Sequence, residues 1–155
     1  MKNEKILYKE SQHLYIMKLI LLARFLLFLG YNSVEEEKIE MLLWTILGSF
    51  IMLLIIYLLF FRFVIVVSSS SIYLSFGIGI INKKIPIEEI RGAEKATIPW
   101  YRGMGIKIIN RNTFQYNGKT GDAIMVRLTE KNYIISSKNT EELLSIIKHL
   151  SNITE

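Results

Sequence analysis

Two long apolar segments dominate the first 61 residues of the chain. Residues 41–61 read MLLWTILGSFIMLLIIYLLFF without a charge, and residues 14–30 are nearly as apolar. As a helix rising 1.5 Å per residue, the uncharged run would span roughly 30 Å, the thickness of a bilayer's hydrocarbon core. The pattern therefore predicts two transmembrane helices that form a hairpin within residues 1–61, followed by a second domain over residues 62–155.

Charged residues flank these two segments unevenly. Residues 31–40, between them, contain four glutamates and one lysine, whereas lysines and Arg62 gather on the outer flanks. Lysine and arginine mark the cytoplasmic side of membrane segments. This distribution predicts a multi-pass protein of the cell membrane with both termini in the cytoplasm.

Arg24 is an unusual charge inside the first apolar segment. One interpretation is an intramembrane site or a pairing position, because a charge at this depth is costly. The other is a side chain that extends toward the acidic loop, which we favour because the second segment offers no acid to pair with it. Gly48 and Ser49 of the second segment are small enough to allow close helix packing.

From residue 62 onward, short β-rich runs alternate with turn signals. Ile124, Val126 and Leu128 alternate with polar residues, which places them on one face of a strand. The pair Asn117–Gly118 predicts a tight hairpin turn, because these residues tolerate the positive φ angles that such turns need.

An amphipathic helix is predicted at the end of the chain. Asn139 is a candidate N-cap, and Glu142 three residues later completes a capping-box pattern. Apolar residues between 143 and 150 form one stripe. Together with about seven strands, this predicts an α+β domain: a small, bent or partly closed antiparallel sheet capped by the helix.

The second half of the chain resembles a family of bacterial pleckstrin-homology-like membrane proteins, mostly of unassigned function. The resemblance rests on four runs: KKIPIEEI (83–90), PWYRGMGIK (99–107), YNGKTGDAIMVRL (116–128) and YIISSKNTEELLSII (133–147). The sequence departs from the family pattern at Met104 and Lys107, and it lacks the frequent proline before Glu141. The resemblance implies a seven-stranded bent sheet capped by one helix, and no catalytic residues.

Composition and motifs argue against catalysis. The chain has no cysteine and only two histidines, at opposite ends, so no thiolate site or histidine cluster is expected. Gly118–Lys119–Thr120 lacks the first glycine of a phosphate-binding loop, because residue 113 is threonine. We therefore expect no enzyme activity, no cofactor, no metal site and no nucleic-acid partner.

Basic and aromatic residues form the best binding candidate in a chain with a net charge of +5. The candidates are Lys83, Lys84, Arg91, Lys95, Trp100, Tyr101, Arg102 and Lys107. Basic residues near an anionic leaflet contribute about 1 kcal/mol each, and Trp and Tyr favour the headgroup level. The competing interpretation is that the charges are ordinary solvated positions and that Trp100 packs in the core.

Two functional hypotheses follow from these patterns. The first is a membrane-anchored, non-catalytic binding module whose second domain contacts anionic headgroups of the inner leaflet or a protein partner. The alternative is a structural or assembly subunit of a membrane complex, including a role of the bacteriocin-immunity type or a homo-oligomer. The Arg24 and Gly48 positions motivate the alternative.

Overall fold

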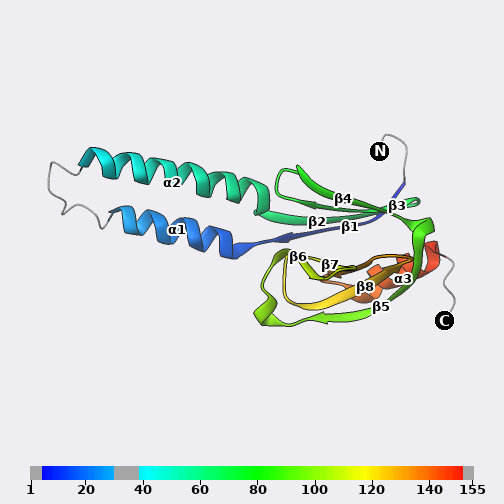
Figure 1. The fold of residues 1–155 in the computed structure, drawn as a ribbon. Coiled ribbons are helices and arrows are strands. Elements are labelled where there is room, and N and C mark those ends of the chain that lie inside the picture. Colours follow the sequence, from blue (N-terminus) through cyan, green and yellow to red (C-terminus); the bar gives the residue numbers. More distant parts are fainter. Residues whose placement is uncertain (1–4, 30–38, 152–155) are drawn as a thin grey trace.

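The computed structural model describes residues 5–29 and 39–151, without the side chains of residues 16, 17, 21, 27–29, 39 and 41–43. Figure 1 shows its helices and strands. The helices are α1 (Tyr15–Leu29), α2 (Ile39–Phe60) and α3 (Thr140–Leu150), with short 3₁₀ turns η2 (Ile87–Glu89) and η3 (Trp100–Arg102). The strands are β1 (Ile6–His13), β2 (Arg62–Ser68), β3 (Ser71–Phe76), β4 (Ile81–Pro86), β5 (Ile90–Ile98), β6 (Gly105–Asn110), β7 (Thr113–Asn117), β8 (Gly121–Leu128) and β9 (Asn132–Ser136).

The first sheet has the order β1-β2-β3-β4, with every neighbouring pair antiparallel. Its first two strands are separated in sequence by α1 and α2, which extend side by side from one end of the molecule (Figure 1). Leu14 N donates to Phe61 O at 3.1 Å where the two helices join the sheet. The pair of helices is therefore an insertion between two hydrogen-bonded strands.

The second sheet has the order β5-β8-β9-β7-β6, in which β7 and β9 are parallel and the other pairs antiparallel. The main core lies between the two sheets and α3. It includes Phe63, Ile65 and Leu74 from the first sheet, Ile124 and Ile135 from the second, and Leu143 and Ile147 from α3. Strands β2, β3, β8 and β9 contribute alternate residues to it, as the two-residue period of a strand requires.

Two local predictions are confirmed. Asn139 caps α3: its side-chain oxygen accepts from Glu142 N at 3.3 Å, and its amide donates to the Glu142 carboxylate at 2.7 Å. On β8, Ile124 and Val126 are fully buried whereas Arg127 is exposed, so the alternation places the predicted face in the core.

The prediction of a hairpin at Asn117–Gly118 is wrong. β7 and β8 are not neighbours, because β9 lies between them in the second sheet. Gly118 does not have a positive φ, unlike five other glycines. A Cβ atom at this position would lie 2.7 Å from Gln12 Cβ and 2.9 Å from Phe63 Cβ. Glycine is needed here for close approach to the first sheet, not for a tight turn.

The predicted fold class is also wrong. Instead of a transmembrane hairpin followed by one seven-stranded bent sheet, the described chain holds nine strands in two sheets together with three α-helices. The extra strands include β1, which precedes both long helices. The C-terminal helix packs against strands of both sheets and does not cap one sheet alone.

The prediction of membrane-spanning helices over residues 14–30 and 41–61 is corrected as well. Among the residues that the structure describes, no helix is both long and apolar enough to cross a membrane. At 1.5 Å per residue, the 15 residues of α1 extend about 22 Å, which is shorter than the hydrocarbon core of a bilayer. The predicted multi-pass location with cytoplasmic termini depended on the same two segments and is corrected with them.

Arg24 joins the two long helices. Its guanidinium donates to the Ser49 hydroxyl at 2.5 Å, and that hydroxyl donates to Ile46 O one turn earlier on α2. The side chain therefore pairs with α2 and does not extend toward the loop, most of which lies outside the described residues. Gly48 does not mediate this contact, because a Cβ added there would meet no atom within 4 Å.

Candidate functional site

The η3 turn presents two aromatic side chains to solvent. Trp100 is 84 % exposed and Tyr101 is 69 % exposed, with the rings edge-on at a centroid distance of 6.1 Å. The turn is closed by Arg102 N donating to Pro99 O and by Gly103 N donating to Trp100 O, and Gly103 ends it at φ 63°. The expectation that Trp100 packs in the core is therefore wrong.

Two basic residues flank these aromatic rings. Arg102 belongs to the turn itself, and Lys107 on β6 reaches back, with Nζ 3.5 Å from the place a Cβ on Gly103 would occupy. The buried Asn117 amide donates to Gly103 O at 2.7 Å and fixes the loop from below. We call Trp100, Tyr101, Arg102 and Lys107 the basic-aromatic tip.

The tip lies at the end of the molecule from which α1 and α2 extend (Figure 1). The β3–β4 turn lies at this end too, because Ile78 N donates to Leu58 O near the end of α2. Ile78 and Ile80 in that turn are 56 % and 68 % exposed. Apolar and aromatic side chains are therefore exposed in two separate loops at one end of the sheets.

Arg91 and Lys95 on β5 do not join the tip. Lys95 Nζ lies 2.8 Å from the Glu141 carboxylate, and Arg91 Nε donates to Thr129 Oγ1 at 3.4 Å. The hydrogen bond and charge of Glu141 raise the pKa of Lys95, and Lys95 in turn lowers the pKa of Glu141. Both residues tie β5 to neighbouring elements at exposed positions, where such pairs contribute little.

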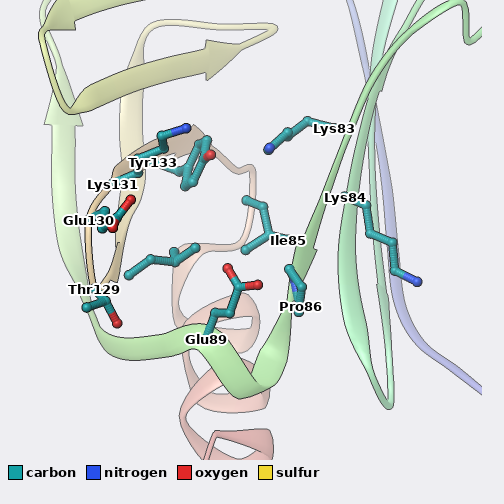
Figure 2. Close-up of a pocket in the computed structure, with 10 residues that line it drawn as sticks. Lys83, Lys84, Ile85, Pro86, Glu89, Thr129, Glu130, Lys131 and Tyr133 are labelled. Carbon is teal, nitrogen blue, oxygen red and sulfur yellow. The ribbon is translucent and has the colours of Figure 1, made fainter.

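Lys83 and Lys84 lie on β4 and point in opposite directions. Lys83 pairs in register with Leu74, so it lies on the face of the first sheet that carries the core. Lys84 pairs with Tyr73, and its ammonium lies 5.2 Å from the centre of that ring. Figure 2 shows Lys83 directed toward Tyr133, whereas Lys84 points away from the cleft.

A cleft of about 470 Å³ separates β4 of the first sheet from the β8–β9 turn of the second. Its lining residues are Lys83, Lys84, Ile85, Pro86, Glu89, Leu128, Thr129, Glu130, Lys131 and Tyr133 (Figure 2). Of these, only Lys83 and Lys84 were candidates from sequence. The rest were missed because they come from β4, η2, β8, the β8–β9 turn and β9, which meet only in the folded chain.

A buried hydrogen-bond network centres on Glu10 of β1. Its carboxylate accepts from Tyr8 Oη at 2.6 Å, Gln12 Nε2 at 2.7 Å, Ser137 Oγ at 2.7 Å and Lys138 N at 2.8 Å. Glu10 is only 8 % exposed. The network joins β1 of the first sheet to the segment between β9 and α3.

The same network shifts two pKa values. Burial on its own would raise the pKa of Glu10, but hydrogen bonds from Ser137, Tyr8, Lys138 and Gln12 outweigh it and lower that pKa. Burial and then the hydrogen bond to Glu10 raise the pKa of Tyr8 to about 12. Glu10 is therefore held as an anion by its donors, which is the arrangement of a structural carboxylate and not of a proton donor.

Within the described ranges, no three His, Cys, Asp or Glu side chains gather as metal ligands would. No family model matches the chain, and neither a curated protein nor a solved structure is similar to it. The resemblance to pleckstrin-homology-like proteins therefore stays a prediction from sequence, and the functional argument depends on the geometry of the tip and the cleft.

Proposed function

We propose that the protein is a non-catalytic binding module whose basic-aromatic tip contacts anionic lipid headgroups. The observation that carries the proposal is the exposure of Trp100 and Tyr101 beside Arg102 and Lys107. Exposed aromatic rings are costly in water and favourable at the headgroup level, where one part of the ring is apolar and the other is wet. This contact is peripheral and needs no membrane-spanning helix.

Charge and shape both support this binding mode. Each basic residue near an anionic surface contributes about 1 kcal/mol, so Arg102 and Lys107 would supply about 2 kcal/mol at low salt. The exposed Ile78 and Ile80 at the same end would add apolar contact. The attraction acts within a Debye length, about 8 Å at physiological salt, so binding should weaken as salt rises.

The test is co-sedimentation of the full chain with vesicles of phosphatidylcholine, with and without phosphatidylserine, across a salt series. Wild type is expected to bind the anionic vesicles in a salt-sensitive way. Arg102→Gln with Lys107→Gln should reduce the salt dependence, and Trp100→Ala with Tyr101→Ala should reduce binding at every salt concentration.

Arg111→Gln is the matched control, because Arg111 is exposed in the turn at the other end of β6. It removes one positive charge at the far end of β6 without touching the tip, and it is compared with Arg102→Gln and Lys107→Gln made singly. Equal losses for Arg111→Gln and for the tip variants would mean that net charge alone governs binding. Capture of a protein by the tip without vesicle binding would replace the lipid with a protein partner.

A structural role in an assembly is the second candidate, favoured by the exposed apolar surface of α1 and α2. Large exposed side chains on these helices include Leu19, Phe25, Trp44, Phe50, Met52 and Ile55. Contiguous apolar surface of this kind marks interaction sites in folded proteins. We infer that a second copy of the chain covers it.

Analytical ultracentrifugation of the full chain tests the second candidate. A dimer is expected. Gly48→Leu should weaken it, because the added side chain fits the single chain, where the space beside Gly48 is open, but would enter space that the second copy occupies. A concentration-independent monomer would rule out self-association through these helices.

A further inference from the structure

The cleft between the two sheets holds two lysines on facing elements. Lys83 extends from the inner face of β4, and its Nζ lies 5.7 Å from the centre of the Tyr133 ring. Lys131, in the β8–β9 turn, places its Nζ 5.9 Å from the centre of the Phe114 ring. The Phe114 and Tyr133 rings stack at 5.9 Å, so the two ammonium groups lie over one continuous aromatic surface.

Neither ammonium is neutralised by a carboxylate. The ion pairs Lys95–Glu141 and Arg127–Glu94 lie outside the cleft, and within the described part of the chain neither Lys83 nor Lys131 forms an ion pair with a carboxylate. Lys83 faces inward from the edge strand β4 and is half-buried. Its ammonium group is therefore partly removed from water without an acidic partner. Two like charges that face one another across a cleft favour an anion between them.

The other end of the cleft has the opposite charge. Figure 2 shows the Glu89 carboxylate directed into the cleft below Ile85, on the side away from the lysine ammonium groups. Apolar atoms of Ile85 and Leu128 lie between these two ends. The cleft therefore has two lysine ammonium groups at one end, with Glu130 beside Lys131 on the turn, a short apolar wall, and the Glu89 carboxylate at the other end.

We propose that this cleft binds a small zwitterion with a phosphate monoester at one end and an amine at the other. The phosphate, with a charge near −2, is held by Lys83 and Lys131. The amine is held by Glu89, and the short carbon linker lies against Ile85 and Leu128. The ligand class goes beyond the proposed lipid contact and does not depend on it.

The cleft and the basic-aromatic tip lie at opposite ends of β8. The first residue of β8, Gly121, pairs with Ile98 just before the tip, and the last, Leu128, lines the cleft. Gly121 and Leu128 are the two ends of this extended strand and lie about 23 Å apart. When the tip contacts a bilayer, the cleft therefore lies away from the bilayer surface. We accordingly infer that the ligand of the cleft is a soluble molecule and not a lipid headgroup.

Isothermal titration calorimetry of the full chain with O-phosphoethanolamine, at low salt, tests the proposal. Saturable binding is expected. Lys83→Gln and Lys131→Gln should each weaken it about tenfold, as expected when a charged hydrogen bond is lost. Glu89→Gln should weaken the binding of phosphoethanolamine but leave the binding of inorganic phosphate unchanged, because only the amine interacts with the Glu89 carboxylate.

Lys9→Gln is the control, since this exposed lysine lies on β1, at the opposite edge of the first sheet from β4. Thermal unfolding of each variant establishes that it is folded. Vesicles containing phosphatidylethanolamine should not compete with the soluble ligand. No heat of binding up to millimolar phosphoethanolamine, equal weakening by Lys9→Gln, or competition by the vesicles would each overturn the proposal.

Discussion

Glu10 holds a negative charge in the interior and satisfies it with four donors. Replacing it with glutamine puts an amide NH₂ where the carboxylate accepts, and at least one donor loses its acceptor. Breaking a buried charged network of this kind costs about 2–4 kcal/mol. Urea unfolding of Glu10→Gln should therefore show a loss of that size in the free energy of unfolding.

Glu88→Gln is the matched control, because Glu88 is an exposed carboxylate in η2. Its substitution should change stability by less than about 0.5 kcal/mol. If the two variants lost the same stability, the Glu10 network would contribute nothing beyond a surface charge.

The depressed pKa of Glu10 also predicts how stability depends on pH. The folded pKa lies below the ordinary value of 4.5, so the unfolded state binds its proton first as pH falls. The contribution of the charged carboxylate is complete above pH 4.5 and is lost as pH falls through the folded pKa. The stability difference between wild type and Glu10→Gln should therefore be constant near neutral pH and shrink in acid.

Unfolding curves of both proteins between pH 7 and pH 3 measure this difference directly. Other carboxylates titrate in the same range, but their effect is common to both proteins and cancels. A difference that keeps its neutral value at pH 3 would mean that Glu10 is not the titrating group.

At the scale of elements, the connection between β7 and β8 packs against the first sheet through Gly118. A Cβ at this position would lie 2.7 Å from Gln12 Cβ and 2.9 Å from Phe63 Cβ, both well inside contact distance. Gly118→Ala must push β1 and β2 away, which should cost about 1–3 kcal/mol. Thermal unfolding is the measurement.

Gly92→Ala is the corresponding control on β5. Its Cβ would meet only the Arg127 side chain, at 3.9 Å, and its φ is not positive. Stability should be unchanged or slightly higher, because alanine has less backbone freedom to lose. A large loss at Gly92 as well would indicate general sensitivity of the sheets to side-chain addition.

The sequence correctly predicts the features that depend on residues close together in the chain. The cap of α3 depends on two side chains three residues apart, and the face of β8 depends on alternation within one strand. By contrast, β1 buries Tyr8, Glu10 and Gln12 and exposes Ile6 and Leu7. Hydrophobic patterning cannot find such a strand, because hydrogen bonds from distant residues are what permit its burial.

The same distinction applies to the candidate site: residues close together in sequence could be predicted, and residues brought together only by folding could not. The basic-aromatic tip occupies residues 99–107 and could be recognised as one run of sequence. The cleft could not, because Lys83 and Lys131 meet through the stacking of two sheets. Asn117–Gly118 shows the same limit: the dipeptide suits a hairpin, but strand order places β9 between its flanking strands.

At the scale of the whole molecule, β1 is held by contacts with residues far along the chain. It pairs with β2 across the two long helices, and Glu10 and Gln12 reach the end of β9. A chain lacking residues 1–13 would lose one edge of the first sheet and leave the Ser136 and Ser137 hydroxyls without these partners. We expect this truncated chain to be much less stable, measured by circular dichroism and urea unfolding.

A peptide of residues 5–13 should restore the truncated chain when added in excess. An extended segment that adds to an open sheet edge gains backbone hydrogen bonds along its length, and here it also restores the buried carboxylate. The same peptide with Glu10→Gln should bind at least tenfold more weakly, because its amide cannot accept all the donors that face it. If both peptides restored stability equally, β1 would be held by strand pairing alone; a difference would show that the buried charge selects this strand for this edge.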